Sequence, residues 1–214
     1  MKRTKPKVPE AAEGAAAPGR APTQQRSRER VERLLNVAAS LIAARGSAAL
    51  RMSDVAEKAG VSIGSLYQYF PDKGAIIRTL AERYNAQGRA CIAEALTPVR
   101  DKAGLRRAFS GLIDTYYAIF LAEPVMRDIW SGIQADRTLQ EIDRDDSRIN
   151  GAVLAAAMAR ARPRADRAAL ENAAFLVMQL GESTMRLAVS VERRQGDALV
   201  EGYKRMVLRE IAPD

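Results

Sequence analysis

The sequence predicts an all-α protein. Apolar residues recur at spacings of three and four through most of the 214 residues, and glycines and prolines separate these stretches. Sustained alternation of apolar and polar residues with hairpin turns, which a β-sheet would require, does not occur. The expected helices cover residues 26–45, 53–59, 63–70, 73–97, 103–122, 124–135, 137–161, 165–193 and 196–211.

A basic arm is expected to precede the first helix. Residues 1–25 contain four prolines and almost no large apolar side chain, which favours a disordered segment. From Arg26 one apolar stripe begins, and Gly46 is a suitable end for its helix. The stripe consists of Val31, Leu34, Leu35, Ala38, Leu41 and Ile42.

Two short helices joined by a tight turn come next. Ser53 is expected to cap the first helix, and Gly60 supplies the positive φ that the turn requires. Ser62 is expected to cap the second helix. This order is a helix-turn-helix in outline, in which the second helix enters the major groove of DNA.

The remainder of the chain continues as helices. Pro71 blocks the second short helix, and Asp72 is expected to cap a long helix that begins at Lys73. The predicted organisation is a disordered arm at 1–25, a helix-turn-helix domain at 26–72 and a helical domain at 73–214.

The composition excludes several classes of function. The chain has no histidine and one cysteine, which rules out a Ser-His-Asp triad, a Cys-His pair, a Cys/His zinc site and an intrachain disulfide. No run of 18 apolar residues occurs, and no apolar stretch follows the first basic residues as in a secretory signal. We expect a cytoplasmic protein that is not an enzyme, does not contact a membrane and uses no cofactor or metal.

The positive charge is concentrated near the N-terminus. Residues 1–74 hold 13 Lys and Arg against 7 Asp and Glu, whereas residues 75–214 hold 21 against 19. Such asymmetry indicates an end that binds nucleic acid. A solvated surface with a basic tail explains the same composition, so the choice depends on motifs.

The second short helix has an outer face that suits DNA. A helical wheel turns Leu66 and Phe70 towards the core and leaves Ile63 between the core and the outside. Small residues let the backbone approach a groove, glutamine pairs with adenine, and tyrosine hydroxyls suit phosphates. The outer face consists of Gly64, Ser65 and Gln68, with Tyr67 and Tyr69 beside it.

The segment from Met52 to Lys73, MSDVAEKAGVSIGSLYQYFPDK, resembles the DNA-binding domain of the TetR family of bacterial regulators. The shared elements are the D-V-A-x-x-A-G-V-S turn, the G-S-L-Y-x-Y-F recognition helix and the P-x-K step into the next helix. The resemblance extends over about residues 26–80, and the later helices share with the family only their length and helicity.

The resemblance implies a homodimer that binds a palindromic operator in double-stranded DNA, usually represses transcription and is released by a small-molecule effector. Tyr67, Tyr69 and Lys73 stand at its phosphate-contacting positions, while Ile63 departs from the polar or basic residue that is frequent there. The implied DNA-binding residues are Ser53, Ser62, Ile63, Gly64, Ser65, Tyr67, Gln68, Tyr69 and Lys73.

Each of these assignments has a simpler alternative. Tyr67 and Tyr69 are core aromatics in that interpretation, and Lys73 is a solvated lysine in a first helical turn. The basic arm, with Arg20, Arg26 and Arg28, is either an inert tail or a contact to the DNA backbone or minor groove. At the level of the whole chain, the alternative is a helical interaction protein whose helix-turn-helix no longer binds DNA.

Bulky side chains in two later stretches predict an effector pocket. They lie within residues 105–130 and 175–189, and for any one of them plain core packing is the alternative. Asp114, Gln134 and Ser183 are further polar groups that could orient a ligand, whose identity the sequence does not reveal. The candidate ligand-binding residues are Phe109, Ile113, Tyr116, Tyr117, Phe120, Met126, Trp130, Phe175, Met178, Gln179 and Glu182.

The last two helices, at about 165–193 and 196–211, carry small and apolar residues, and the family resemblance implies that they pair with those of a second copy.

An acidic run could coordinate Mg²⁺ or Ca²⁺. Arg144 and Arg148 lie within it and favour a self-neutralised surface instead, and Cys91 is expected to be a small core residue. The acidic run consists of Glu141, Asp143, Asp145 and Asp146.

Overall fold

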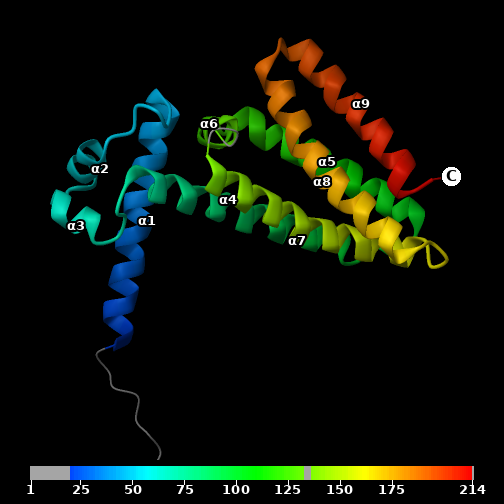
Figure 1. The fold of residues 1–214 in the computed structure, drawn as a ribbon, viewed down its shortest axis with the longest axis horizontal. Helices are drawn as coiled ribbons and strands as arrows, with labels where there is room; N and C mark the ends of the chain where they lie inside the picture. The colour runs from blue at the N-terminus through cyan, green and yellow to red at the C-terminus, as the bar shows by residue number, and fades with distance from the viewer. Residues whose placement is uncertain (1–19, 133–135, 214) are drawn as a thin grey trace, which may run out of the picture.

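The computed structural model describes residues 20–132 and 136–213, and within these ranges the chain forms nine helices and no strand (Figure 1). The all-α prediction is therefore confirmed. The helices are α1 (Arg20–Arg45), α2 (Met52–Ala59), α3 (Ile63–Tyr67), α4 (Lys73–Leu96), α5 (Lys102–Ala122), α6 (Pro124–Ser131), α7 (Arg137–Ala161), α8 (Arg167–Ser190) and α9 (Arg193–Ile211).

Helices α1, α2 and α3 form a head at one end of the molecule (Figure 1). The apolar stripe of α1 is buried against Val55 of α2 and Leu66 of α3, each of which has almost no exposed surface. Gly60 connects α2 to α3 with φ +67°, and Gly46 ends α1 with φ +79°, so both glycines adopt the left-handed conformation that the sequence predicts.

The start of α1 differs from the prediction. The helix begins at Arg20 rather than Arg26, so residues 20–25, expected in the arm, are helical. Pro22 does not prevent this, because the first turn of a helix needs no backbone N–H at that position. The rest of the predicted arm, residues 1–19, lies outside the described residues.

Three other helix boundaries were predicted wrongly. Arg51 rather than Ser53 occupies the N-cap of α2, and Ser53 lies within the helix. Helix α3 ends at Tyr67 instead of continuing to Phe70, because Tyr69 N–H and Phe70 N–H both bond to the carbonyl of Leu66 in a tightened turn. Helix α9 begins at Arg193, so Gly196 is not the break between the last two helices.

Gly196 instead allows α8 and α9 to pack closely. A Cβ atom at this position would collide with the Ala188 carbonyl of α8 and would lie 3.0 Å from the Tyr117 hydroxyl of α5. The turn before it is closed by Glu192, whose carboxylate accepts the backbone N–H groups of Arg194 and Gln195.

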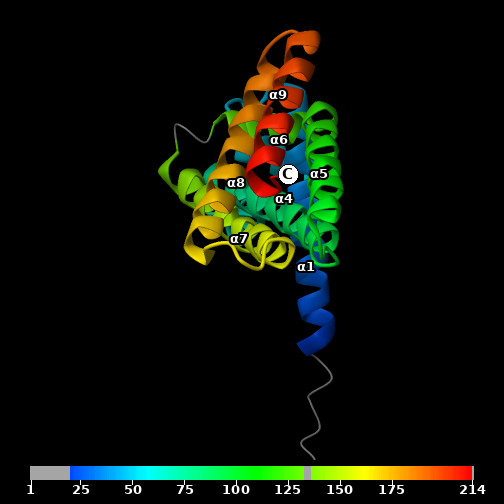
Figure 2. The same ribbon diagram turned by 90° about the vertical axis from the view of Figure 1, so that its right-hand side faces the viewer.

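The other helices form a bundle that α4 joins to the head (Figure 1). Helices α4, α5, α7 and α8 lie side by side in both views, and α9 folds back along α8 as an antiparallel partner (Figure 2). Short α6 lies between the bundle and α1. Among the described residues, the main contacts between the bundle and the head are those of α4 and α6 with α1.

Candidate nucleic-acid interface and ligand cavity

Helix α3 is held rigidly on its inner side. Ser62 caps it, with its Oγ accepting the backbone N–H of Ser65 at 3.1 Å, as the sequence predicts. Leu66 and Phe70 are buried in the core of the head, also as predicted. These contacts fix which side of α3 faces outwards.

The outer side of α3 is open. Gly64, Tyr67 and Gln68 are exposed, and Tyr67 leaves half of its surface accessible. Ile63 is 44% exposed, which resolves the ambiguity of the helical wheel in favour of the outside. No atom lies within 4 Å of the position that a Gly64 Cβ would take, so the backbone of α3 is accessible from outside.

The remaining DNA-binding candidates surround this face to different degrees. Ser53 and Ser62 are exposed, whereas Ser65 is half-buried and Tyr69 packs partly against the core. The core-aromatic alternative therefore describes Tyr69 better than Tyr67. We use the name recognition surface for all nine candidates, Ser53, Ser62, Ile63, Gly64, Ser65, Tyr67, Gln68, Tyr69 and Lys73.

Lys73 has a structural contact as well as an exposed position. Its Nζ donates to the backbone carbonyl of Ala48 at 3.0 Å, which ties the start of α4 to the segment between α1 and α2. Arg26 and Arg28, which the sequence analysis counted with the basic arm, are exposed on helix α1.

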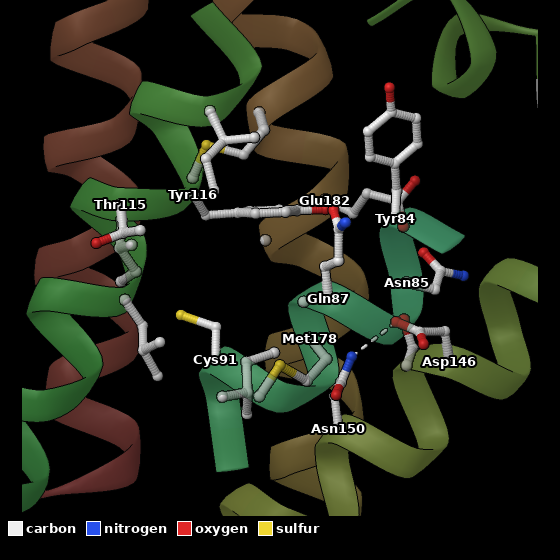
Figure 3. Close-up of a pocket in the computed structure, with 18 of the residues that line it drawn as sticks. Tyr84, Asn85, Gln87, Cys91, Thr115, Tyr116, Asp146, Asn150, Met178 and Glu182 are labelled. Carbon is white, nitrogen blue, oxygen red and sulfur yellow. Dashed lines mark hydrogen bonds between the residues drawn. The ribbon is translucent and has the colours of Figure 1, made fainter. Parts of the chain in front are cut away.

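A cavity of about 190 Å³ lies inside the helical bundle (Figure 3). Its walls come from α4, α5, α6, α7, α8 and α9. An engineered cavity of similar size accepts a benzene ring, so this one suits a ligand built on a single ring. Six of the predicted ligand-binding residues line it: Phe109, Ile113, Tyr116, Met126, Met178 and Glu182.

Tyr117 and Phe120 do not line the cavity, although both lie on the same helix as Tyr116. Tyr117 turns towards α9, where its hydroxyl donates to Asp197 Oδ1 at 2.9 Å. Phe120 is fully buried and meets the Tyr116 ring edge-on at 5.0 Å between ring centroids. The apolar stripe of α5 is wide enough to serve two neighbours, and only part of it faces the cavity.

Trp130, Phe175 and Gln179 also lie outside the cavity wall. Trp130 packs edge-on against Tyr84 and donates its indole N–H to Glu182. Phe175 lies beneath the Arg148 guanidinium, and Gln179 Nε2 donates to Ser147 Oγ at 2.7 Å. Trp130 and Gln179 therefore support lining residues, and Phe175 contacts Arg148, which does not line the cavity.

The other polar candidates lie elsewhere. Asp114 is exposed and forms an ion pair with Lys204. Ser183 is exposed and accepts a hydrogen bond from Arg186. Gln134 lies outside the described residues.

The sequence did not reveal the wall contributed by α4 and α7. The polar residues of this wall sit in helices whose composition resembles any solvated helix, so no pattern marked them. Cys91 is exposed and contributes to this wall, so its assignment to the core was wrong. The main polar lining residues missed are Tyr84, Asn85, Gln87, Asp146 and Asn150.

One end of the cavity holds a pair of carboxyl groups. Glu182 of α8 lies beside Asp143 of α7, and a neighbouring like charge disfavours the ionised form of Glu182. Burial and the Asp143 charge raise the pKa of Glu182 to about 9, against the opposing effects of Arg186 and the Trp130 indole. At neutral pH Glu182 is therefore protonated.

Further buried groups complete this end. Figure 3 shows Tyr116 extending from α5 towards Glu182, and burial, with the nearby Glu182 charge, raises the pKa of the Tyr116 hydroxyl. Burial also raises the pKa of Asp146, although this carboxylate pairs with Arg89 and accepts Asn150 Nδ2 at 2.7 Å.

The acidic run does not form a metal site in the described part of the chain. No group of three or more potential ligands occurs there. Asp145 pairs with Arg148 and Glu141 with Arg137, so the exposed members are neutralised by neighbouring arginines.

Helix α6 contacts both the cavity and the head. Met126 lines the cavity and Trp130 donates to Glu182. Between them, Asp128 Oδ2 accepts the backbone N–H of Ser47, just after α1, at 2.8 Å. Within one eight-residue helix, side chains therefore touch both the cavity wall and the head.

A head with an exposed helix-turn-helix, joined to a helical domain, is the arrangement of helix-turn-helix transcription regulators. The comparisons agree. Residues 34–80 match the model of the bacterial regulatory proteins of the tetR family, and residues 103–214 match that of the tetracyclin repressor-like C-terminal domain. The chain belongs to the TetR family of DNA-binding transcriptional regulators, and the resemblance proposed from the sequence is confirmed.

Solved structures share the fold. A TetR-family transcriptional regulator from Streptomyces coelicolor is 24% identical, with 85% of this chain and 96% of that chain covered and a TM-score of 0.62. The TetR-family repressor AlkX from Dietzia sp. is 19% identical, with 86% and 98% covered and a TM-score of 0.55. RolR in complex with resorcinol is 20% identical, with 88% and 95% covered and a TM-score of 0.61.

Two comparisons were negative. No curated protein sequence matches the chain. Within residues 20–132 and 136–213, no helix combines the length and apolarity needed to cross a membrane.

Proposed function

We propose that the protein is a dimeric repressor that binds a palindromic operator through the recognition surface and is released when a small molecule enters the cavity. The observation that carries the proposal is the open outer side of α3. A buried Leu66 and Phe70 orient this helix, while Gly64, Tyr67 and Gln68 face solvent. Such a side can enter a major groove without rearrangement of the head.

Exposed apolar residues on α8 support a dimer. Leu176, Leu180 and Leu187 follow helical spacing on one side of α8, and Leu176 and Leu187 each leave half or more of their surface exposed. Met206 of α9 is exposed to a similar degree. Pairing of α8 and α9 with their copies would cover these side chains and would relate two heads by two-fold symmetry, as a palindrome requires.

The contacts of α6 support release by a ligand. A molecule in the cavity would touch Met126 and displace the surroundings of Glu182, to which Trp130 is hydrogen-bonded. Any shift of α6 moves Asp128, which holds the Ser47 N–H at the end of α1. A ligand that binds better to the shifted arrangement would lower the population of heads spaced for DNA. The resorcinol bound by RolR is a single-ring compound, and the cavity volume here suits that size.

Selection of operators from random duplexes by the purified protein tests the function. A palindromic consensus is expected, with half-sites about one helical turn apart. The selected duplex should then bind more weakly to Tyr67→Ala than to the parent protein. Enrichment of no sequence would contradict the proposal and would favour the helical interaction protein.

Light scattering tests the dimer separately. Leu176→Lys combined with Leu187→Lys places charges on the exposed side of α8 and should yield monomers. Ile149→Lys is the control, since Ile149 of α7 is equally exposed and apolar but lies off that side. A wild-type monomer at micromolar concentration would reject the dimer.

A further inference from the structure

The cavity has a chemical bias that its size does not explain. Its lining includes two carboxyl groups, from Glu182 and Asp146, and no lysine or arginine, although the chain as a whole carries a net charge of +8. An anionic ligand would therefore meet acids whose arginine partners, Arg89 and Arg186, stand outside the lining. The lining selects against carboxylates and phosphates.

The charged groups beside the cavity sum to zero only while one of their carboxyl groups holds a proton. Asp143, Asp146 and Glu182 face Arg89 and Arg186, and burial together with the Asp143 charge keeps Glu182 protonated. Removal of that proton leaves one negative charge in excess next to the cavity. A ligand with one positive charge would replace the proton and restore the balance.

An unsatisfied acceptor gives independent support. Asn150 lines the cavity and is only 7% exposed, its Nδ2 is committed to Asp146, and its Oδ1 has no hydrogen-bond partner among the described residues. Buried acceptors without a donor are uncommon in native proteins, so a donor supplied from the cavity is the natural partner. An ammonium group carries three such donors.

Aromatic rings complete a site for a cation with an apolar body. Tyr84, Phe109 and Tyr116 line the cavity, and their faces attract a cation that water no longer screens. Around Glu182, the titratable and charged groups are Arg186 on α8, Tyr116 on α5, Asp143 and Asp146 on α7, Arg89 and Tyr84 on α4 and Tyr203 on α9, with the Trp130 indole on α6. None of these groups, apart from the two committed arginines, is a base.

We propose that the effector is a small single-ring amine that binds as its ammonium ion beside Glu182. Because the raised pKa of Glu182 keeps this carboxyl group protonated at neutral pH, one proton leaves as the amine binds. The inference rests on the proposed function, because it assigns the effector to this cavity. The proton moves from the carboxyl pair to solvent, and the ammonium nitrogen takes its place beside the resulting carboxylate. Since one proton is released for each cation bound, affinity rises with pH while the amine stays protonated.

Calorimetric titration of the full chain with three matched probes tests this selectivity. The probes are 2-phenylethylamine, 2-phenylethanol and phenylacetate, which present an ammonium, a hydroxyl and a carboxylate on similar bodies. The amine should bind at least about tenfold more tightly than the alcohol, and the carboxylate should not bind measurably. Amine affinity should rise by up to about tenfold per pH unit from pH 6 to pH 8, with release of one proton in buffers of differing ionisation enthalpy.

Variants connect the selectivity to the carboxyl pair. Glu182→Gln should abolish proton release and should remove the preference for the amine over the alcohol. Glu171→Gln, an exposed glutamate on the same helix, should change neither property. Asp143→Asn removes the like charge and should lower the proton release at pH 7, which keeps the test available if Glu182→Gln does not fold.

Equal binding of amine and alcohol, preferred binding of phenylacetate, or binding of none of the three would overturn the inference. Release of the selected operator is measured in parallel with the same probes. An amine that binds with proton release but leaves the DNA complex intact would refute the effector role and retain the cation site. Operator binding by a protein that takes up no amine would refute the cation site and retain the regulator.

Discussion

The head and the helical bundle present opposite kinds of binding site. The recognition surface is exposed, small and polar, and it lies on the part of the chain that carries most of the excess positive charge. The cavity is recessed between helices, mostly apolar, and acidic at one end. The first is assembled from residues 53–73, a single short stretch, whereas the second draws on six helices.

The two sites differ in how strongly their residues contribute to the stability of the protein. Side chains on the outer side of α3 contribute little to the core, so they can change without unfolding the protein. Residues around the cavity serve as core and as binding wall together, so a change in specificity there also alters packing. The experiments below separate the two sites on this basis.

Gly64→Leu should have the largest effect, and on DNA binding alone. The space around Gly64 accommodates a side chain, so the folded state should tolerate leucine, but leucine on the outer side of α3 would hold the backbone away from the groove. We expect affinity for the selected operator to fall by about 10³-fold, towards that for random duplex, in a gel-shift assay.

Gly111→Leu is the matched control. Gly111 of α5 is also exposed and has no atom within 4 Å of its Cβ position, but it lies away from the head. Unchanged operator binding by both variants would show that α3 does not enter a groove.

Gly196→Ala should act on stability. Its methyl group would meet the Ala188 carbonyl, so α8 and α9 must separate, at a cost of about 1–3 kcal/mol in the free energy of unfolding. Urea denaturation measures the loss. Gly202→Ala in the same helix, where the nearest atom lies at 3.9 Å, should be neutral or slightly stabilising. Equal stability of the two variants would mean that the helices are further apart than described.

Glu182→Gln should remove a pH dependence of stability. The folded-state pKa of Glu182, about 9, lies above its ordinary value of 4.5, so the native state holds an extra proton between these values. Stability is therefore complete below about pH 4.5 and declines as pH rises towards 9, by up to about 1.4 kcal/mol per unit. Unfolding measured at pH 6 and pH 8 should show a smaller decline in the variant than in the parent or in Glu171→Gln. A steeper decline in the variant would contradict the assigned protonation.

Lys73→Ala should have the smallest effect. If Lys73 contacts a phosphate, the slope of log affinity against log salt concentration should fall by about one. Lys58→Ala is the control, because Lys58 is also a hydrogen-bonded lysine of the head, with Nζ 3.0 Å from Ser40 Oγ, but is not part of the recognition surface. The same slope for both variants would leave Lys73 with only its bond to Ala48.

Local rules predicted much of this structure. Ser62 and Asp72 cap their helices, and Gly60 takes a positive φ, because each depends on a few adjacent residues. The outer side of α3 followed in the same way from the spacing of Leu66 and Phe70.

The cavity was predicted only in part because its geometry is not local. Tyr116 and Tyr117 are adjacent and chemically alike, yet one faces the cavity and the other faces Asp197 of α9. Asp143 and Glu182 meet only because α7 packs on α8, so no spacing in the sequence marks them as a pair. The way the helices pack against one another decides which side chains face the cavity, and no local sequence pattern predicts that packing.

The short helix α6 has a consequence for how new specificities arise. It carries the hydrogen bond to Ser47 at the end of α1, while most of the cavity wall belongs to α4, α5, α7 and α8. Substitutions in α5, α7 and α8 can change what the cavity accepts without altering α4 or α6, the two helices of this domain that pack on α1. A gene duplicate could thus come to answer a different compound while it keeps its inherited operator.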